Sequence, residues 1–394
     1  MESVNTLENV LCMKGGNGDS SYAYHSPSVQ LKIVLALKPL LENGIYQNVR
    51  TSKKAVDGVF RIADLGCATG MNTLLTADTI VTAVKSTFIR HSMEVPEFQV
   101  HFADLPSNDF NTLFRTLPPF RGPVEILSGD GRTGLTAAAV HDVDKPPATR
   151  SYFASAVSGS HYRRLFPRQT LHFCHSSTSL HWLSQVPASI EDRSSAAWNG
   201  GHVYISSDAV ADAYLNQFKQ DFAAFLDARA EEIIPGGCMF TALLGRNSAD
   251  VKEQSGLGAC AFHLEAAFQE LVNEGLIEEE KLDSFNIPYY GPSVEELRSI
   301  VETENSFEIK SVRVLSGFPL HPLLEVREGE EQMFGRIVGK HYRALFENIV
   351  GAHLRWDEYL IDEFFARIAN RAAAKYGEYL PNTLDLVTVF LLRK

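Results

Sequence analysis

The chain has 394 residues, of which 45% are hydrophobic and 21% are charged, a composition and length typical of a globular protein with a large core. Its formal net charge of −12 argues against the basic surface of a nucleic-acid-binding protein, so we expect no nucleic-acid partner. Five widely spaced cysteines without a C-x-x-C pair, and the lack of an apolar run of 18 residues, predict a cytoplasmic protein that has free thiols and does not contact a membrane.

A glycine-rich stretch, "MKGGNGDSSYAYHS" at residues 13–26, comes before any predicted core element. A phosphate-binding P-loop has the order G-x-x-x-x-G-K-[ST] and follows a strand. Here Lys14 precedes the glycines and no strand comes before them, so the order of residues rules out that interpretation.

Apolar segments and helical segments then alternate along the chain. Expected strands lie at 59–70, where a short apolar strand ends in a glycine turn, and at 97–106, 151–159, 170–177 and 235–245. Amphipathic helices are expected at 71–88 and 209–233. This alternation predicts an α/β fold with a doubly wound, mostly parallel sheet. Two later segments, 307–315 and 384–392, are candidates for an antiparallel edge pair.

Helical segments that do not alternate with strands predict a helical cap over one edge of the sheet. They lie at about 259–280, 293–304, 330–350 and 356–376. Residues 121–150 are rich in Gly, Pro and Asp and are predicted to form a long surface loop.

The turn after the first strand, Asp64 to Gly70, reads "DLGCATG". It lacks the dinucleotide fingerprint G-x-G-x-x-G, because Ala68 stands where the middle glycine would be. An acidic strand end followed by G-x-x-x-G resembles the loop that binds S-adenosylmethionine (SAM) in methyltransferases. Asp104, at the end of the second strand, is then the expected partner of two ribose hydroxyls. A dinucleotide site, or a plain tight turn with both aspartates as helix caps, remains open from this motif alone.

Four longer motifs resemble the plant SABATH family of SAM-dependent carboxyl methyltransferases, closest to the indole-3-acetate, cinnamate and salicylate type. They are "ADLGCATGMNT", "DLPSNDFNTLF", "YRRLFPRQTLHFCHSSTSLHWLSQVP" and "GLIEEEKLDSFNIPYYGPS". The resemblance runs through nearly the whole chain and implies a Rossmann-like class I methyltransferase fold with an α-helical cap. It also implies SAM as cofactor, S-adenosylhomocysteine (SAH) as product, and a homodimer. The implied segments are an N-terminal active-site segment at 1–35, a SAM-binding core at 36–245 and a mainly helical cap at 246–394.

The resemblance assigns the two ligands to particular residues. It implies a cofactor site of Tyr22, Ser26, Asp64, Gly66, Asn72, Asp104, Leu105, Ser160 and His161. It implies a substrate site of Lys14, Gln30, Tyr152, Cys174, Thr178, His181, Trp182, Tyr289 and Tyr290. His161 stands where relatives often carry phenylalanine, and Thr178 where some carry tyrosine.

Gln30 and Trp182 are the implied catalytic pair that holds the substrate carboxylate. Counting without a gap puts Val29 at the glutamine position, and Gln30 fits with a shift of one residue. Indole N–H and amide NH₂ groups donate hydrogen bonds without a positive charge. His181 is not needed as a base, because a carboxylic acid is already ionised at neutral pH.

A cation site is also implied by the resemblance, built from Asn199, Asp283, Phe285 through its carbonyl, and Asn286. Oxygen ligands suit a hard ion such as Mg²⁺. The alternative for Asp283 is a helix cap.

The function expected from these residues is in-line transfer of a methyl group from SAM to the carboxylate of a small, aromatic plant metabolite. Indole-3-acetate, cinnamate or coumarate, and benzoate or salicylate are the candidate substrates. The alternatives are N-methylation of a xanthine-type substrate, or a non-catalytic protein that binds a small acid.

Overall fold

The computed structural model describes residues 7–16, 18, 20–25, 29–51, 58–120, 149–251, 257–319, 329–379 and 383–394. Most of the loop predicted at 121–150 lies outside the described residues.

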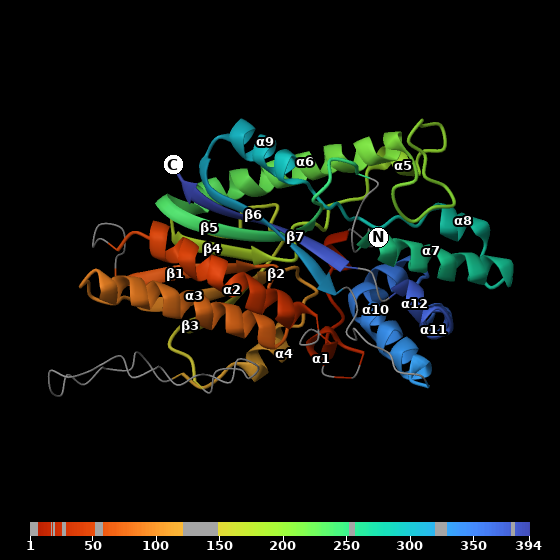
Figure 1. Ribbon diagram of the computed structural model, residues 1–394, viewed down its shortest axis with the longest axis horizontal. Coiled ribbons are helices and arrows are strands. Elements are labelled where there is room, and N and C mark those ends of the chain that lie inside the picture. Colours follow the sequence, from red (N-terminus) through yellow and green to blue (C-terminus); the bar gives the residue numbers. More distant parts are fainter. Residues whose placement is uncertain are drawn as a thin grey trace, which may run out of the picture.

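A seven-stranded sheet with the order β3-β2-β1-β4-β5-β7-β6 runs through the centre of the molecule (Figure 1). Strands β1 to β5 are parallel, and β7 lies antiparallel between β5 and β6. The strands are β1 (Val59–Leu65), β2 (Glu97–Asp104), β3 (Phe153–Ser158), β4 (Leu171–Ser177), β5 (Ile233–Gly245), β6 (Phe307–Pro319) and β7 (Thr383–Arg393). The reversal of strand order beside β1 creates the switch point at which open α/β sheets bind ligands.

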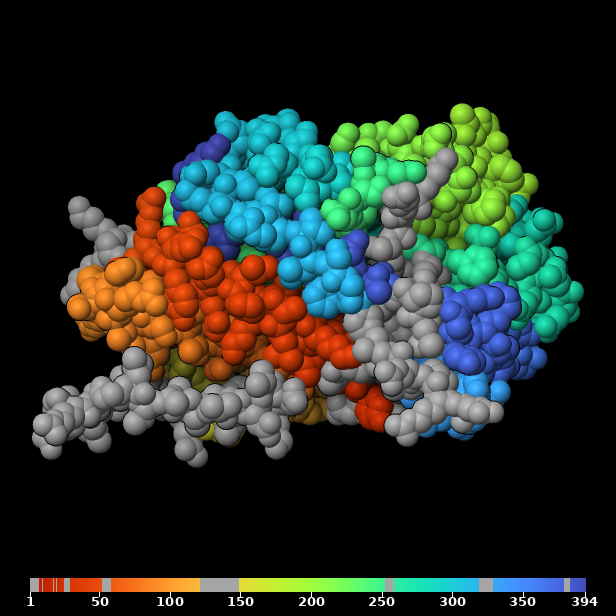
Figure 2. All heavy atoms as spheres, in the orientation of Figure 1, coloured from red at the N-terminus to blue at the C-terminus, as the bar shows by residue number. Residues whose placement is uncertain are grey.

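Helices cover both faces of this sheet and gather at one of its ends. In Figure 1, α2 and α3 lie over one face, α6 and α9 over the other, and α7, α8 and α10 to α12 at the end. Figure 2 shows the face formed by α2 and α3, with the cap helices beside it. The longer helices are α2 (Gln30–Asn48), α3 (Met71–Arg90), α6 (Asp208–Glu232), α7 (Leu257–Asn273), α9 (Val294–Glu304), α10 (Glu331–His353) and α11 (Glu358–Ala374). The short ones are α1 (Tyr22–His25), α4 (Phe110–Thr116), α5 (Ala188–Glu191), α8 (Glu279–Asp283) and α12 (Tyr376–Tyr379), together with a 3₁₀ turn at Leu7–Asn9.

The predicted α/β fold is confirmed, and each predicted strand overlaps an observed one. The antiparallel pair at the edge is β6 and β7. The helix expected at 259–280 is instead two helices, because Gly275 adopts a positive φ of 69° after α7 ends. None of the described helices combines the length and apolarity that crossing a bilayer requires.

Helix α2 was not among the predicted elements. It contains Pro39 and Gly44, two residues that usually interrupt helices. Its buried face nevertheless packs on the sheet, and Gly44 allows the closest approach, since a Cβ there would lie 2.3 Å from the Phe390 ring. Packing against the sheet therefore outweighs the low helical propensity of these two positions.

The last turn of α6 contains an ion pair without solvent exposure. Arg229 Nε donates to Glu232 Oε2 at 2.8 Å, and both side chains are 0% exposed. Arg229 also donates to the carbonyls of His161 and Arg163, while Glu232 accepts from the amides of Leu165 and Phe166. The pair thus fixes the backbone of the loop that follows β3 onto the end of α6.

We expect Arg229→Met to lower the free energy of unfolding by about 3–5 kcal/mol, because it leaves Glu232 charged and buried without its partner. Chemical denaturation measures this change. Arg168→Met is the matched control, because Arg168 forms an exposed ion pair at 3.3 Å with Glu231, which is also in α6. Loss of this exposed pair should cost less than about 1 kcal/mol. Equal losses in the two variants would contradict the structural importance of the buried pair.

Candidate active site

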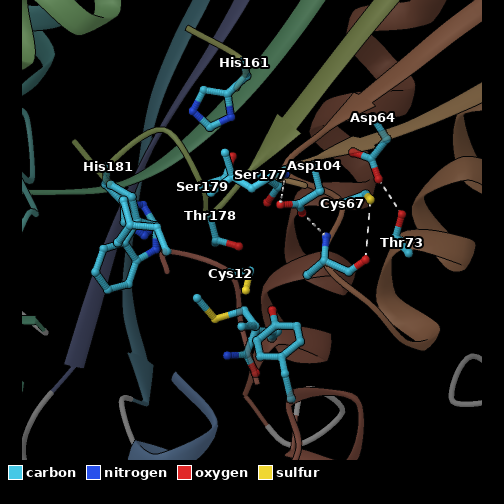
Figure 3. Close-up of a pocket in the computed structure, with 18 of the residues that line it drawn as sticks. Cys12, Asp64, Cys67, Thr73, Asp104, His161, Ser177, Thr178, Ser179 and His181 are labelled. Atoms are coloured by element: carbon cyan, nitrogen blue, oxygen red, sulfur yellow. Dashed lines mark hydrogen bonds between the residues drawn. The ribbon is translucent and has the colours of Figure 1, made fainter. Parts of the chain in front are cut away.

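A cavity opens where the carboxyl ends of β1, β2 and β4 meet the N-terminal segment and the cap. Its walls come from parts of the chain that are far apart in sequence. Figure 3 shows Asp64 and Asp104 at one side of this cavity, His181 at the other, and Cys12 and Thr178 between them. The position matches the ligand-binding edge of a doubly wound sheet.

The turn after β1 bends so that its backbone faces the cavity. Gly66, Ala68 and Gly70 have φ angles of 75°, 50° and 105°, values that favour glycine. The amides of Gly66 and Cys67 both donate to the Ala103 carbonyl at the end of β2, at 2.8 and 3.2 Å. A side chain at Gly66 would collide with Ser179, at 2.4 Å. The glycine therefore keeps the turn close to its neighbours and open to a ligand.

Asp104 is the half-buried carboxylate at the end of β2. The Ala68 amide donates to its Oδ2 at 2.6 Å, and the Leu105 amide donates to its Oδ1 at 2.7 Å. Each oxygen keeps a lone pair for a further hydrogen bond, as two ribose hydroxyls require. Burial raises the pKa of Asp104 to about 6, and the nearby Asp64 charge adds to this, while the two amide hydrogen bonds act in the opposite direction.

Asp64, at the end of β1, also lines the cavity, and both of its carboxylate oxygens have protein partners. Thr73 Oγ1 donates to Oδ2 at 2.5 Å, and His175 Nδ1 lies 2.7 Å from Oδ1. Asp64 thus ties β1 to α3 and β4. Its predicted contact with the cofactor remains a prediction.

The side of the cavity next to Asp104 and the turn after β1 is where the methyl donor is predicted to bind, and we call it the donor side. The other residues predicted to contact the cofactor also line the cavity: Tyr22, Gly66, Asn72, Leu105, Ser160 and His161. Ser26 lies outside the described residues. Burial lowers the pKa of His161 to about 3, with a further contribution from Arg229, so this ring is neutral at physiological pH.

Trp182 and Gln30 line the same cavity from segments that are far apart in the sequence. Gln30 is the first residue of α2, and its buried Oε1 has no hydrogen-bond partner among the described residues. The half-buried Trp182 ring packs edge-on against Tyr289 and Phe346, and its carbonyl accepts a hydrogen bond from Tyr162. Val29 also lines the cavity, but its side chain offers no polar group, which favours Gln30 as the partner of Trp182.

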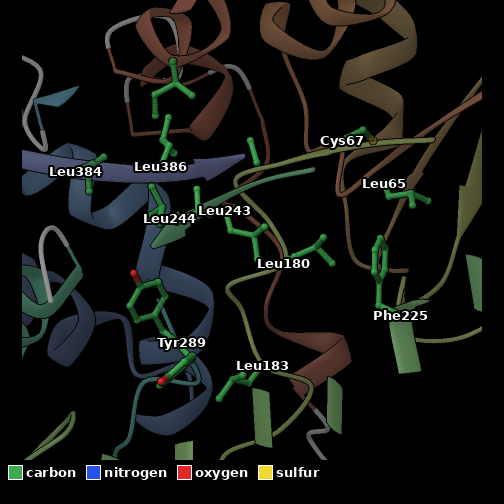
Figure 4. Close-up of a cluster of buried hydrophobic side chains, with 14 of the residues drawn as sticks. Leu65, Cys67, Leu180, Leu183, Phe225, Leu243, Leu244, Tyr289, Leu384 and Leu386 are labelled. Atoms are coloured by element: carbon green, nitrogen blue, oxygen red, sulfur yellow. The ribbon is translucent and has the colours of Figure 1, made fainter. Parts of the chain in front are cut away.

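The segment that carries Trp182 is fixed by its neighbours. Leu180 and Leu183 are buried on either side of it, in the cluster that also contains Leu243 and Leu244 (Figure 4). The Leu183 amide donates to the Pro288 carbonyl at 2.8 Å. This anchoring holds Trp182 at the cavity wall.

His181 has a defined protonation pattern. Its Nδ1 accepts from the Leu244 amide at 3.2 Å, so the ring hydrogen is on Nε2. Burial lowers the pKa of His181 to about 3, with a further contribution from His161, so the ring is neutral. It can donate one hydrogen bond but has little basicity for removing a proton at neutral pH.

Cationic side chains are absent from the described lining of the cavity, which contains Glu8, Asp64 and Asp104 but neither Lys nor Arg. Lys14, expected at the substrate, instead forms an ion pair with Glu347 of α10 at 2.7 Å and does not line the cavity. An anionic ligand would therefore meet neutral hydrogen-bond donors here.

Tyr152, Cys174, Tyr289 and Tyr290 were predicted as substrate contacts, but they are buried and do not line the cavity. Tyr289 supports Trp182 from behind, and the Tyr290 amide donates to the His181 carbonyl at 2.9 Å. Thr178 and His181 do line the cavity. Direct contact of the first four with a substrate remains a prediction that this arrangement does not favour.

Close contacts with Asp109 explain why glycines occur near the start of the chain. The Gly16 amide donates to Asp109 Oδ2 at 2.9 Å, on the carboxylate that also caps α4 through Thr112. A Cβ at Gly15 would lie 3.0 Å from the Asp109 Cβ, and Gly16 has a φ of 85°. This contact holds the N-terminal segment, which supplies Cys12, Met13 and Tyr22, against the cavity.

The predicted cation residues do not fit a metal ion in this arrangement. Asn199 Oδ1 accepts from Ser206, Asn286 Oδ1 accepts from Asn199 at 2.8 Å, and Asp283 pairs with Arg193 at 3.0 Å. Phe285 packs its ring on Phe268. Among the described residues, no group of three or more His, Cys, Asp or Glu side chains is placed to hold a metal.

Several residues that line the cavity were not predicted, and they come from segments that are far apart in the sequence. They include Cys12, Met13, Ile33, Cys67, Cys260, His341, Leu345 and Leu384. Periodicity predicts the helices and the strand that carry Cys260, His341, Leu345 and Leu384, but nothing local in the sequence indicates which face meets the cavity. Burial raises the pKa of the Cys12, Cys67 and Cys260 thiols, so all three are protonated and weakly nucleophilic.

We expect SAH binding to weaken about tenfold as the pH falls from 7 to 5. The folded-state pKa of Asp104 is about 6, so below that pH its carboxyl gains a proton and loses capacity to accept hydroxyl hydrogen bonds. His161 and His181, with pKa values of about 3, do not titrate in this window.

Isothermal calorimetry of SAH binding across this pH range measures the effect. Asp104→Asn should bind more weakly at pH 7 and lose the pH dependence. A flat profile for the unchanged protein would show that Asp104 does not hold the ligand in its ionised form.

Comparison with known proteins agrees with this geometry. The sequence model of the family described as SAM dependent carboxyl methyltransferase matches residues 8–394. Indole-3-acetate O-methyltransferase 1 of Oryza sativa subsp. japonica is 41% identical over 370 residues, covering 93% of this chain and 88% of that protein. The Arabidopsis thaliana protein of the same name is 40% identical, covering 95% and 93%.

A solved structure of loganic acid methyltransferase with SAH superposes with a TM-score of 0.79 at 32% identity, covering 97% of this chain and 98% of that one. The fold is therefore that of the class I SAM-dependent methyltransferases. The chain belongs to the family of SAM-dependent carboxyl methyltransferases.

Proposed function

We propose that this protein transfers the methyl group of SAM to the carboxylate of a small plant acid and releases the methyl ester and SAH. The observation that carries the proposal is the cavity itself. It faces the glycine turn and Asp104 on one side and the N–H-bearing side chains of Gln30 and Trp182 on the other, with no Lys or Arg in its described lining.

The cofactor supplies an electrophilic methyl group on a cationic sulfur. Asp104 is placed to hold its ribose, and the turn from Gly66 to Ala68 offers backbone close to the ligand. These residues fit the cofactor because Asp104 keeps acceptor capacity on both oxygens, and the absence of a side chain at Gly66 lets the turn pack against Ser179 with its backbone at the cavity.

Gln30 and Trp182 would orient the acid. Neutral donors hold a carboxylate without adding a cation that would compete with the sulfonium for its lone pairs. A carboxylic acid is ionised at neutral pH, so the reaction needs no general base, and the neutral His181 is consistent with this. One C–O bond forms as one S–C bond breaks. Holding two reactants in line can contribute about 7–11 kcal/mol of barrier reduction.

An aromatic acid, with indole-3-acetate as the first candidate, is the proposed substrate. Two relatives of about 40% identity carry that name. The cap side of the cavity is apolar, with Leu244, Leu345, Leu384 and Cys260, as a ring system requires. His341 is the polar residue on that side.

Three further features of the protein are part of the proposal. A homodimer follows from the family resemblance, and a cytoplasmic location from the free thiols. Magnesium takes part in no step, since the Asn199, Asp283 and Asn286 side chains are engaged by protein donors.

Trp182→Phe should lower kcat/KM for the acid by about 10- to 150-fold, which is the loss expected for one hydrogen bond to a charged group. The substitution keeps an aromatic ring next to Phe346 but replaces the indole with a smaller phenyl group and removes the indole N–H. SAH affinity should change less than about twofold. Trp198→Phe is the matched control, because Trp198 is a surface residue stacked on Arg193 and outside the cavity lining. Full activity in Trp182→Phe would refute the assigned role.

The substrate itself is identified by incubating the purified protein with methyl-labelled SAM and a panel of acids. The panel contains indole-3-acetate, cinnamate, coumarate, benzoate, salicylate and a xanthine. We expect labelled ester from an aromatic acid and none from the xanthine. Labelling of the xanthine alone would replace carboxyl transfer with N-methylation, and binding without turnover would indicate a non-catalytic acid-binding protein.

A further inference from the structure

The loop at residues 159–166 contacts both sides of the cavity. It begins where the Gly159 amide donates to the Asp104 carbonyl at 2.9 Å, next to the donor side. Ser160, His161 and Tyr162 then line the cavity. A single short segment of the cavity wall therefore extends from the Asp104 side to the Trp182 side.

The buried ion pair of α6 fixes this loop from behind. Arg229 donates to the carbonyls of His161 and Arg163 at 2.8 and 2.9 Å. Glu232 accepts from the amides at the end of the loop. Because five hydrogen bonds, including the bond within the pair, converge on two unexposed side chains, the loop backbone has little freedom to shift.

Tyr162 extends from this loop to the acceptor side. Its hydroxyl donates to the Trp182 carbonyl at 2.6 Å, and the Leu180 carbonyl lies farther from the same oxygen, at 3.4 Å. Burial raises the pKa of the Tyr162 hydroxyl, which keeps it a donor.

We propose that Tyr162 is a positioning residue that couples the donor-binding loop to Trp182 and so sets the alignment of the acid with the methyl group. This inference rests on the proposed function. Other contacts hold the Trp182 segment from the cap side, such as the Leu183 amide bound to the Pro288 carbonyl at 2.8 Å. The Tyr162 hydroxyl provides a direct hydrogen bond from the loop at 159–166 to the Trp182 backbone.

Loss of the Tyr162 hydroxyl should therefore affect the acid and the cofactor differently. Removing the hydroxyl frees the Trp182 backbone to move relative to the loop, and displacements of about 1 Å in a reacting pair can cost about 100-fold in rate. Ser160 and His161 stay fixed by Arg229 and Glu232, so the cofactor should bind as before. A merely structural role would affect both ligands or neither.

The test is Tyr162→Phe in the full chain. We expect kcat/KM for the acid to fall about tenfold or more, and SAH affinity by calorimetry to stay within twofold. Tyr214→Phe is the matched control: Tyr214 is fully buried, its hydroxyl donates to the Ile287 carbonyl at 3.0 Å, and it does not line the cavity. The Tyr214→Phe variant should lose about as much thermal stability as Tyr162→Phe, and its kcat/KM for the acid should stay unchanged.

A second variant tests whether restoring a hydrogen-bond donor at position 162 restores activity. Replacing Tyr162 with 4-aminophenylalanine keeps the ring and an N–H donor, and it should restore kcat/KM for the acid to within about threefold. If Tyr162→Phe does not fold, the 4-aminophenylalanine variant tests the proposal alone. A tenfold fall in its kcat/KM for the acid, although the N–H donor is present, would overturn the proposal. Unchanged acid kinetics in Tyr162→Phe, or an equal loss of SAH affinity, would also overturn it.

A failure of the proposed function is distinguishable from these results. If the unchanged protein methylates no acid, calorimetry of indole-3-acetate binding to the SAH complex replaces turnover as the measurement. A tenfold weaker acid affinity in Tyr162→Phe would then support the coupling, and equal affinities would overturn it.

Discussion

Burial of the titratable side chains around the cavity at the carboxyl ends of β1, β2 and β4 is the constraint on which the rest of the site depends. It raises the pKa of Asp104 and of the thiols and lowers the pKa of His161 and His181. The cavity is therefore lined by neutral groups and a few carboxylates. In such surroundings an anionic acid and a cationic sulfur attract each other more strongly than in water.

The same desolvation protects the protein from its own reagent. Cys12, Cys67 and Cys260 all line the cavity, and a thiolate there would be a better nucleophile than a carboxylate. Burial raises the pKa of each thiol, for Cys260 to about 12. With the thiols protonated and Nδ1 of His181 occupied by the Leu244 amide, these side chains do not compete with the substrate carboxylate for the methyl group.

Local patterns in the sequence predicted the part of the site that is built locally. The strand ending at Leu65, the glycine turn after it and Asp104 follow from apolar runs, glycines and a strand-end acid, and all face the cavity. The pair of Gln30 and Trp182 came from the family resemblance rather than from spacing. Helix α2 was missed because Pro39 and Gly44 oppose helix formation in isolation, whereas contact with Phe390 is visible only in the fold.

Residues that act through a distant partner could not be predicted in this way. Tyr162 and Trp182 are 20 positions apart, and Arg229 meets His161 across 68 positions. Lys14 reaches Glu347 across 333, so the N-terminal segment closes on a cap helix near the other end of the chain. Each of these contacts depends on how far two elements are rotated and separated after the sheet has formed. Their residue types, a tyrosine, an arginine and a lysine, are common on any surface, and only burial and geometry distinguish them. The alignment of donor and acceptor is therefore a property of the tertiary fold.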